Sequence, residues 1–256
     1  KLCTTHDASL LVGLSNSFAD FIVSPLAAFF IRSSANLACS SEYFASILSD
    51  REKMRAGSFH FKKNKKRFII GRGILRIILG FYLDIKPELL EFLYGPYGKP
   101  QLNEKNYNET IQFNLTHSHE LALCAFTRGR RLGIDLEYIT NIPDLKVITT
   151  HIFSRRENKK FKKIPKNKKL NAFLKCWTVK EAYSKAIGTG LTELYKQFNL
   201  SFSLKISTSK RKIKKYIKKT SNWSLMSFAP LPDYTASLVV EGQDWYLSQF
   251  QFKLEK

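Results

Sequence analysis

The 256-residue sequence passes twice from helical to strand-like spacing, and this limits the folds open to it. Apolar residues at helical spacing predict a helix over residues 49–83, with Ser49 or Asp50 as its N-cap, and a second short helix at 86–94. The turn "GPYGKP" at 95–100 interrupts this pattern, and from Phe113 apolar and polar residues alternate as in β-strands. Helices followed by strands indicate an α+β fold.

The second half of the chain repeats this order of elements. The segment "ELALCAFTRGRRLGIDLEYI" predicts a hairpin with the turn "RGRR", and helical segments are expected at about 141–163 and 168–187, before Gly188 and Gly190. Four further strands are expected in "FNLSFSLKIS", "NWSLMSFAP", "YTASLVVEG" and "WYLSQFQFKL". We therefore expect two α+β lobes, at 49–112 and 113–256, and leave residues 1–48 unassigned.

The charge balance is strongly basic, because 42 Lys and Arg residues face 21 Asp and Glu residues and give a net charge of +21. Such a chain suits an anionic partner, but much of the excess lies in runs such as "KKFKKIPKNKK" that can equally be a solvated surface. The four cysteines form no C-x-x-C pair, which favours reduced thiols in the cytoplasm. No run reaches the roughly 18 apolar residues that a membrane helix requires.

Two carboxylates, Asp135 and Glu137, stand two residues apart in a predicted strand and therefore share one face. Their backbones lie roughly 6.5 Å apart, where two unit charges repel by roughly 2.5 kcal/mol at an effective dielectric of 20. A divalent cation such as Mg²⁺ would offset this repulsion. The alternative is an exposed face on which the acids meet Arg130 and Arg131.

A third acid stands on the helix predicted for "FLKCWTVKEAYSKAIGTG", where Phe173, Trp177, Glu181 and Lys185 follow an i, i+4 repeat. Glu181 and Lys185 can be an ordinary exposed pair. The indole of Trp177 on the same stripe instead suggests a covered face, on which a Glu and a Lys require partners.

Groups suited to phosphate occur in three further segments. Thr116 and His117 end the strand "FNLTHS", Lys99 lies in "YGKP", and Arg72 and Arg55 lie in the predicted first helix. With the three acids, they describe a metal-assisted site for a polyphosphate ester. The chain has no G-x-x-x-x-G-K-[ST] and no G-x-G-x-x-G motif, so nucleotide folds of those kinds are not expected.

Four segments, "FNLTHS", "GIDLEYI", "FSRREN" and "FLKCWTVKEAYSKAIGTGL", occur in an order and at separations that resemble the 4'-phosphopantetheinyl transferase family. The resemblance is to its longer, two-lobed type, which activates carrier domains of peptide and polyketide synthetases, and it covers roughly residues 49–202. It implies two similar lobes related by a pseudo-twofold axis. It also implies transfer of 4'-phosphopantetheine from coenzyme A to a serine of an apo acyl or peptidyl carrier protein, with release of 3',5'-adenosine bisphosphate.

The resemblance assigns the acidic residues and one lysine. Asp135 and Glu137 match the acids of G-x-D-x-E that hold Mg²⁺, and Glu181 matches the Glu of W-x-x-K-E, which completes the metal site and is a candidate base. Lys185 matches a lysine that contacts the phosphates and neutralises the departing group. Glu157 in "FSRRE" matches an acid near the metal site, without an assigned role.

The remaining matches concern coenzyme A. Thr116 and His117, with Arg72, match residues that receive its 3'-phosphate, Lys99 matches a lysine near the adenine and phosphates, and Arg55 is a further phosphate contact. We expect a cytoplasmic monomer that binds no nucleic acid or membrane. Two alternatives remain: a basic nucleic-acid-binding protein, favoured by "SKRKIKKYIKK", and an inactive relative that only binds coenzyme A or a carrier protein.

Overall fold

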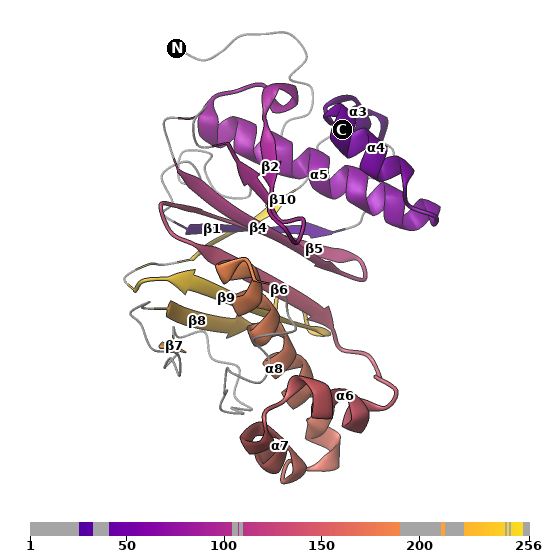
Figure 1. The fold of residues 1–256 in the computed structure, drawn as a ribbon, viewed down its shortest axis with the longest axis vertical. Helices are drawn as coiled ribbons and strands as arrows, with labels where there is room; N and C mark the ends of the chain where they lie inside the picture. Colours follow the sequence, from indigo (N-terminus) through magenta and orange to yellow (C-terminus); the bar gives the residue numbers. More distant parts are fainter. Residues whose placement is uncertain are drawn as a thin grey trace.

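The computed structural model describes residues 26–32, 41–103, 107, 110–189, 211–212, 223–243, 245 and 247–252. Within these residues two four-stranded sheets each carry one long helix, which confirms the α+β class (Figure 1). The elements of the first half are β1 Leu26–Arg32, α3 Ser41–Ser46, α4 Asp50–Gly57, α5 Lys62–Leu83, the 3₁₀ helix η1 Pro87–Leu89, β2 Phe92–Tyr94 and β3 Pro100–Leu102.

The prediction of one helix over residues 49–83 is wrong, because α4 and α5 are separate helices. Ser49 is the N-cap of α4 as predicted, and it forms a capping box in which its side chain and that of Glu52 each accept from the other's backbone N–H. The chain leaves the helix at Ser58, and Phe61 has extended backbone (φ −94°, ψ 124°) before α5 begins. No proline marks this break in the sequence.

The short helix predicted at 86–94 is also wrong beyond its first turn. Only η1 is helical, and the chain then continues as the strand β2, which pairs with β3. The Arg76 guanidinium of α5 donates to the carbonyl oxygens of Pro87 and Leu90, at 2.8 and 3.0 Å. A buried side chain thus binds carbonyl oxygens that a continuing helix would use itself.

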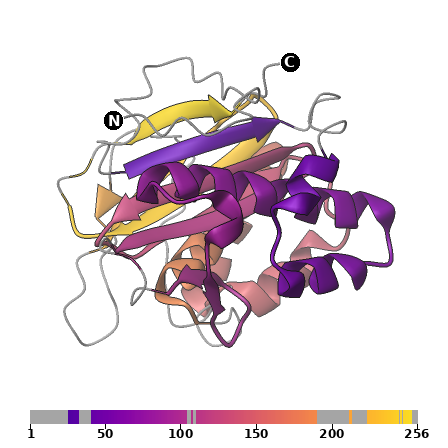
Figure 2. The same cartoon turned by 90° about the horizontal axis from the view of Figure 1, so that it is seen from above.

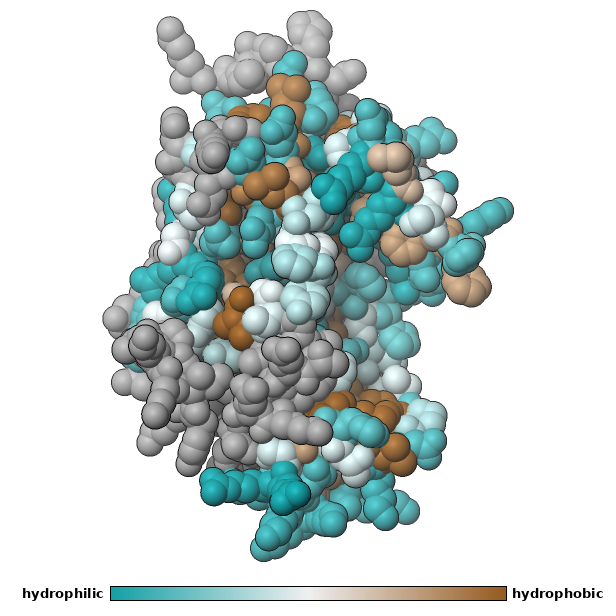
Figure 3. Space-filling model, viewed as in Figure 1, coloured by the Kyte–Doolittle hydropathy of each residue, from teal (hydrophilic) through white to brown (hydrophobic). Residues whose placement is uncertain are grey.

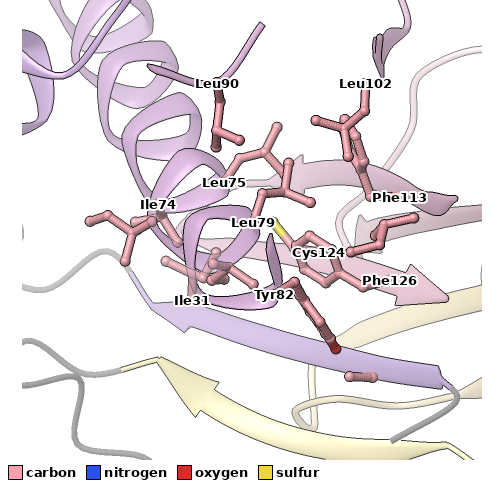
Figure 4. Close-up of a cluster of buried hydrophobic side chains, with 14 of the residues drawn as sticks. Ile31, Ile74, Leu75, Leu79, Tyr82, Leu90, Leu102, Phe113, Cys124 and Phe126 are labelled. Atoms are coloured by element: carbon pink, nitrogen blue, oxygen red, sulfur yellow. The ribbon is translucent and has the colours of Figure 1, made fainter. Parts of the chain in front are cut away.

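The first sheet has the order β10-β1-β5-β4, with β4 Ile111–Ser118, β5 Leu121–Arg128 and β10 Ser248–Phe252. Figure 2 shows α5 lying across this sheet. Its buried residues Leu75 and Leu79 pack with Phe113, Cys124 and Phe126 of the strands (Figure 4). Burial of these apolar side chains fixes α5 over the sheet.

The second sheet has the order β6-β9-β8-β7, with β6 Leu132–Tyr138, β7 Arg211–Lys212, β8 Trp223–Phe228 and β9 Tyr234–Glu241. The long helix α8 Lys166–Ile187 contacts β6 and β9. Two short helices, α6 Leu145–Ile152 and α7 Arg155–Lys162, pack with the first half of α8 at the lower end of Figure 1. The single helical segment predicted at 141–163 is therefore two helices, separated where Ser154 caps α7.

The predicted hairpin across "RGRR" is wrong. β5 pairs with β1 on one side and with β4 on the other, so it has no free edge for β6, which pairs with β9 instead. The hairpin consists of β4 and β5, and the turn at 128–131 leads from the first sheet to the second. The chain therefore passes from the first sheet to the second near residue 130.

Three of the four strands predicted for the end of the chain are confirmed as β8, β9 and β10. The fourth, at 198–207, lies outside the described residues, as does most of the unassigned segment 1–48 apart from β1 and the residues from 41 onward. In the described part of the chain, no helix combines the length and apolar character needed to cross a bilayer.

The two halves share one helical arrangement. An eight-residue helix begins with a Ser-x-x-Glu capping box in each half, and a 22-residue helix follows it. The capping Glu52 pairs with Arg76 at 2.7 Å, and the capping Glu157 pairs with Lys180 at 3.0 Å, all four side chains being at most 2% exposed. Arg76 and Lys180 each stand 14 residues after the start of their helix (62 to 76, 166 to 180). This repetition is compatible with two similar lobes.

Candidate functional site

The candidate site lies where β4 of the first sheet runs beside β6 of the second. The two strands form no ladder with each other but are linked by side chains, at sequence separations of 19 or 20 residues. The Asn114 side-chain oxygen accepts from the Ile134 N–H at 2.9 Å, and the Ser118 hydroxyl donates to Glu137 Oε2 at 3.1 Å. The constant separation means that the strands run in the same direction. We call this pair of strands the seam.

Asp135 is the buried carboxylate of the seam, with a residue exposure of 4%. Its Oδ1 lies 2.6 Å from Lys185 Nζ and accepts from the Thr116 hydroxyl at 3.2 Å. Its Oδ2 is buried and has no hydrogen-bond partner. Burial raises the pKa of Asp135, while Lys185 and Thr116 oppose that shift. One oxygen therefore remains available for a further cationic group.

Glu137 is half-buried, and both of its oxygens are bound. Oε2 accepts from Ser118, and Oε1 accepts from the Trp177 indole N–H at 3.1 Å. Desolvation raises the pKa of Glu137, and the charge of Asp135 adds to this effect. The charge of Asp135 thus disfavours the ionisation of Glu137, as the sequence spacing implies.

The alternative in which these acids meet Arg130 and Arg131 is wrong. Arg131 forms a bidentate pair with Glu241 at 2.7 and 2.8 Å. Arg130 donates to the carbonyl oxygen of Gln243 at 2.6 Å. Both arginines therefore bind groups at the end of β9 and do not contact the acids of β6.

Gly133 allows α8 to approach β6 closely. A Cβ at this position would collide with the backbone oxygen of Ala182 and the backbone nitrogen of Ala186. The close contact brings Lys185 within reach of the strand, where its Nζ also donates to the carbonyl oxygen of Ile134 at 3.3 Å. Glu181 precedes it by one turn and is buried.

A cavity of about 770 Å³ opens between α5, the turn 95–101, the β4–β5 hairpin and the last turns of α8. Six of the nine predicted site residues line it: Arg55, Arg72, Lys99, His117, Glu181 and Lys185. Thr116 and Asp135 adjoin it through their bonds to Lys185. Glu137 lies next along the seam. The structure thus brings residues from both halves of the chain together, while their individual roles remain predictions.

Arg72 is the buried cation of this cavity. Its side chain is 7% exposed and lies 3.3 Å from Glu52, yet its Nε and Nη1 have no hydrogen-bond partner. Aromatic rings of Phe68, Phe92 and Tyr94 surround the guanidinium at 5.5 to 5.8 Å. Burial lowers its pKa. Buried N–H groups without acceptors indicate a place for an anion.

Lys99 and His117 contribute further positive charge or proton donors. Lys99 Nζ donates to the carbonyl oxygens of Leu132 and Lys185 at 3.2 and 2.7 Å, and burial, with the nearby cation Lys185, lowers its pKa to about 8. Desolvation lowers the pKa of His117 below its usual value, and Arg67 and Lys185 add to this. Lys99 therefore also ties the turn 95–101 to α8.

The acids of the seam fit Mg²⁺ in part. The described residues contain no group of three or more His, Cys, Asp and Glu side chains arranged to hold a metal ion, so Asp135, Glu137 and Glu181 do not form a three-acid site in this conformation. The buried, unpartnered Oδ2 of Asp135 beside a second carboxylate does fit a hard cation. Lys185 now supplies the positive charge at Asp135 Oδ1.

Glu157, whose role the sequence left open, is a structural residue here. It caps α7 together with Ser154 and forms the buried pair with Lys180. Sequence reasoning missed Asn114 and Ser118, which orient β6 and Glu137. Their signal is the period of two that they form with Thr116 along an otherwise apolar strand.

Both halves of the chain are similar in sequence to known proteins. A family model described as "4'-phosphopantetheinyl transferase superfamily" matches residues 131–239, and one described as "4'-phosphopantetheinyl transferase, N-terminal" matches residues 38–128. The chain is 37% identical over 201 residues to the 4'-phosphopantetheinyl transferase HetI of Nostoc, covering 78% of this chain and 81% of that protein. It is 34% identical over 129 residues to gsp of Aneurinibacillus migulanus, covering 50% and 51% of the two chains. It is 26% identical over 152 residues to Sfp of Bacillus subtilis, covering 59% and 65%.

Proposed function

The chain belongs to the 4'-phosphopantetheinyl transferase family of enzymes, and we propose that it transfers 4'-phosphopantetheine from coenzyme A to a serine of an apo carrier protein. In the proposed reaction the serine oxygen bonds to the β-phosphorus, the bond from that phosphorus to the bridging pyrophosphate oxygen breaks, and 3',5'-adenosine bisphosphate leaves. The observation that supports this most is the cavity in which Arg72, Lys99, His117 and Lys185 gather beside the acids of the seam.

The cations of the cavity would bind the phosphates. Arg72 offers two buried nitrogens without acceptors, and the nearby His117 and Thr116 would join it at the 3'-phosphate. Lys99 and Arg55 would hold the remaining phosphate and adenosine groups. A dianion would reverse the lowered pKa of His117, because it favours the protonated imidazolium.

Glu181 would act as the general base and accept the serine proton. Lys185 would neutralise negative charge on the departing phosphate. Asp135 and Glu137 would hold Mg²⁺, which when bound would withdraw electron density from the pyrophosphate oxygens. Glu181 would complete the site only after a rearrangement, because the three acids form no metal site in this conformation. Trp177 and Ser118 fix the orientation of Glu137 through its two bound oxygens.

The proposal includes a monomer that works in the cytoplasm. Both strands of the seam come from one chain, so the cavity needs no second copy for its walls. The described cysteines, Cys124 and Cys176, are buried free thiols, which suits a reducing compartment. We propose an acidic carrier protein rather than nucleic acid as the partner, and specific binding of mixed nucleic acid at physiological salt would contradict this.

The test is incubation of the chain with apo carrier protein, coenzyme A and Mg²⁺, followed by intact mass measurement of the carrier. We expect the added mass of phosphopantetheine, and its loss when a chelator removes the metal. Glu181→Gln should lower turnover by about 10²- to 10⁴-fold and change coenzyme A binding much less. No mass gain with several carriers would contradict the proposed function, and full turnover by the variant would remove Glu181 from the mechanism.

A further inference from the structure

Glu52 uses its two carboxylate oxygens for different contacts. Oε2 holds the start of α4 and the interior of α5, because it accepts from Arg76 Nε at 2.7 Å and from the N–H and hydroxyl of Ser49 at 3.0 and 3.1 Å. Oε1 faces the Tyr94 hydroxyl, which donates to it at 3.3 Å, and Arg72 Nε, which also lies 3.3 Å away. One oxygen therefore serves the fold, and the other lies beside the buried cation of the cavity.

The contact between Glu52 and Arg72 is an attraction of charges that leaves donors of the guanidinium unused. Nε and Nη1 of Arg72 are buried and make no hydrogen bond, although Nε is close to the carboxylate. Arg72 lines the cavity, whereas Glu52 does not. The carboxylate thus compensates the charge of Arg72 from behind and leaves two N–H groups for another acceptor.

The second half of the chain contains the same arrangement without an arginine at this place. Arg72 and Cys176 each stand ten residues after the start of their helix (62 to 72, 166 to 176). In the second half the capping Glu157 pairs with Lys180, and burial raises the pKa of the nearby Cys176 thiol, which is therefore uncharged. The capping box and its ion pair thus form without a guanidinium at this position, so the fold alone does not account for Arg72.

The place of Arg72 depends on Glu52 because its other neighbours oppose its charge or hold it weakly. Burial lowers its pKa, the cations Arg55 and Arg76 lower it further, and Glu52 opposes the shift. Three aromatic rings lie 5.5 to 5.8 Å from the guanidinium carbon, those of Phe68, Phe92 and Tyr94. Rings restrain a guanidinium less strongly than a carboxylate does. Without the charge of Glu52, we expect the guanidinium to turn toward water in the cavity.

We propose that Glu52 is a positioning residue for coenzyme A, which holds the Arg72 guanidinium in the cavity wall with its free N–H groups available to the 3'-phosphate. This inference rests on the proposed function, in which Arg72 binds that phosphate. Glu52 does not contact the substrate itself. Its effect on binding therefore requires both Arg72 and the 3'-phosphate.

The test compares coenzyme A with dephospho-coenzyme A, which lacks the 3'-phosphate alone. Glu52→Gln removes the charge beside Arg72, while the amide oxygen can still accept the bonds that Oε2 accepts. Calorimetric titration with Mg²⁺ present should show that this variant binds coenzyme A about tenfold more weakly, as expected for one charge-assisted hydrogen bond. Its affinity for dephospho-coenzyme A should not change.

Arg72→Gln should give the same pattern, because it removes the guanidinium and leaves the pair of Glu52 with Arg76 intact. In a protein that already carries Arg72→Gln, the further change Glu52→Gln should cost no more coenzyme A affinity, since a positioning residue acts through its partner. If Glu52→Gln does not fold, Arg72→Gln still decides the question. An equal change for both ligands would leave no 3'-phosphate contact for Glu52 to position.

Glu157→Gln is the matched control, because Glu157 caps its helix in the same way, is as buried as Glu52 and does not line the cavity. It should lower the thermal midpoint and leave the ratio of the two affinities unchanged. A changed ratio in this control would overturn the inference. Equal weakening of both ligands by Glu52→Gln, tighter coenzyme A binding by that variant, or a further loss in the double variant would do so too. Binding of neither ligand by the wild-type protein would overturn the proposed function as well, so the two failures are distinguishable.

Discussion

At the scale of single residues, two polar side chains of β4 and one lysine of α8 explain how two carboxylates remain side by side on β6. Thr116 donates to Asp135 and Ser118 donates to Glu137, while Lys185 reaches Asp135 from α8. These bonds lower the cost of two adjacent charges, although burial still raises the pKa of both acids. The acids are therefore held in place before any cation or substrate arrives.

We predict that coenzyme A binding weakens as the pH rises from about 6 to about 9. The lowered pKa of His117 leaves it neutral near pH 7, so a bound phosphate must recruit a proton there, which is easier at lower pH. Lys99, with a pKa of about 8, loses its charge above that pH. Titrations of the protein with coenzyme A at several pH values across this range should show the effects of both His117 and Lys99.

Two variants separate the effects. His117→Gln should remove the change in coenzyme A affinity at the acidic end of the pH range. Lys99→Arg should remove the loss of affinity at the alkaline end, because a guanidinium group keeps its proton there. A wild-type affinity that stays constant over the whole range would contradict both assignments.

The residues that the motifs selected lie close together, while their roles remain predictions. Six predicted residues line one cavity, although they come from segments far apart in the sequence. The sequence could not show that Lys185 would bind Asp135, or that Arg131 would prefer Glu241, because these contacts depend on how β6, α8 and β9 meet. Nor could it show that Asn114 and Ser118 would link two strands of different sheets.

At the scale of elements, the approach of α8 to β6 determines the distance between the acids and the helix that carries Glu181 and Lys185. Gly133 is the residue of β6 at the contact, and backbone atoms of Ala182 and Ala186 occupy the space of a side chain. Backbone atoms cannot yield as a flexible side chain does.

We predict that Gly133→Ala lowers the free energy of unfolding by about 1 to 3 kcal/mol, and lowers transfer activity more than this loss explains. The added methyl group must push α8 from the strand and so move Lys185 away from Asp135. Gly57→Ala is the matched control, because nothing lies within 4 Å of a Cβ there and the residue ends α4. It should leave activity unchanged and stability equal or higher. Equal effects of both substitutions, in denaturant titrations and activity assays, would contradict this account.

The periodicity of apolar residues predicted whether a segment is a helix or a strand. It predicted less well where each element begins and ends and which strands pair. The helix α8 ends at Gly188, as predicted, because glycine accepts the left-handed conformation found there, with φ 74°. No proline marks the breaks before α5 and α7. The helical spacing of apolar residues continues across each break, so the sequence predicts one helix where the structure has two. The prediction of a β5–β6 hairpin was wrong. Strands that are neighbours in the sequence usually pair with each other, whereas here the tight turn between β5 and β6 joins two different sheets.

At the scale of the whole molecule, the positive charge is unevenly placed. Residues 155–169, which we call the basic segment, form α7 and the start of α8 and carry nine Lys and Arg residues, while their one acid, Glu157, is buried. Hydrophilic side chains gather at the very bottom of the molecule in Figure 3, below a smaller hydrophobic patch. The last residues of the segment, 166–169, begin the helix that bears Glu181.

We predict that carrier modification slows as salt rises and that the basic segment causes this dependence. Replacing its exposed lysines with Gln should lower kcat/KM for an acidic carrier by about tenfold at low salt and flatten the salt dependence, because steering weakens. Coenzyme A affinity should not change. The replaced residues are Lys159, Lys160, Lys162 and Lys163.

The control removes the same charge from exposed lysines of the first half: Lys62, Lys65, Lys66 and Lys86. It should affect kcat/KM much less. A similar loss of kcat/KM in both variants would mean that net charge causes the effect. If the kcat/KM of the wild type does not depend on salt, the basic segment is an ordinary solvated surface.

The position of β10 has a consequence for synthesis of the chain. β10 pairs in parallel with β1, although the two strands stand near opposite ends of the described sequence. A ribosome releases β1 early and β10 last, so the sheet that begins first is finished last. Until then the nascent protein carries an unpaired edge beside β1, which other strands can join. The first sheet is therefore complete only after every strand of the second sheet has been made.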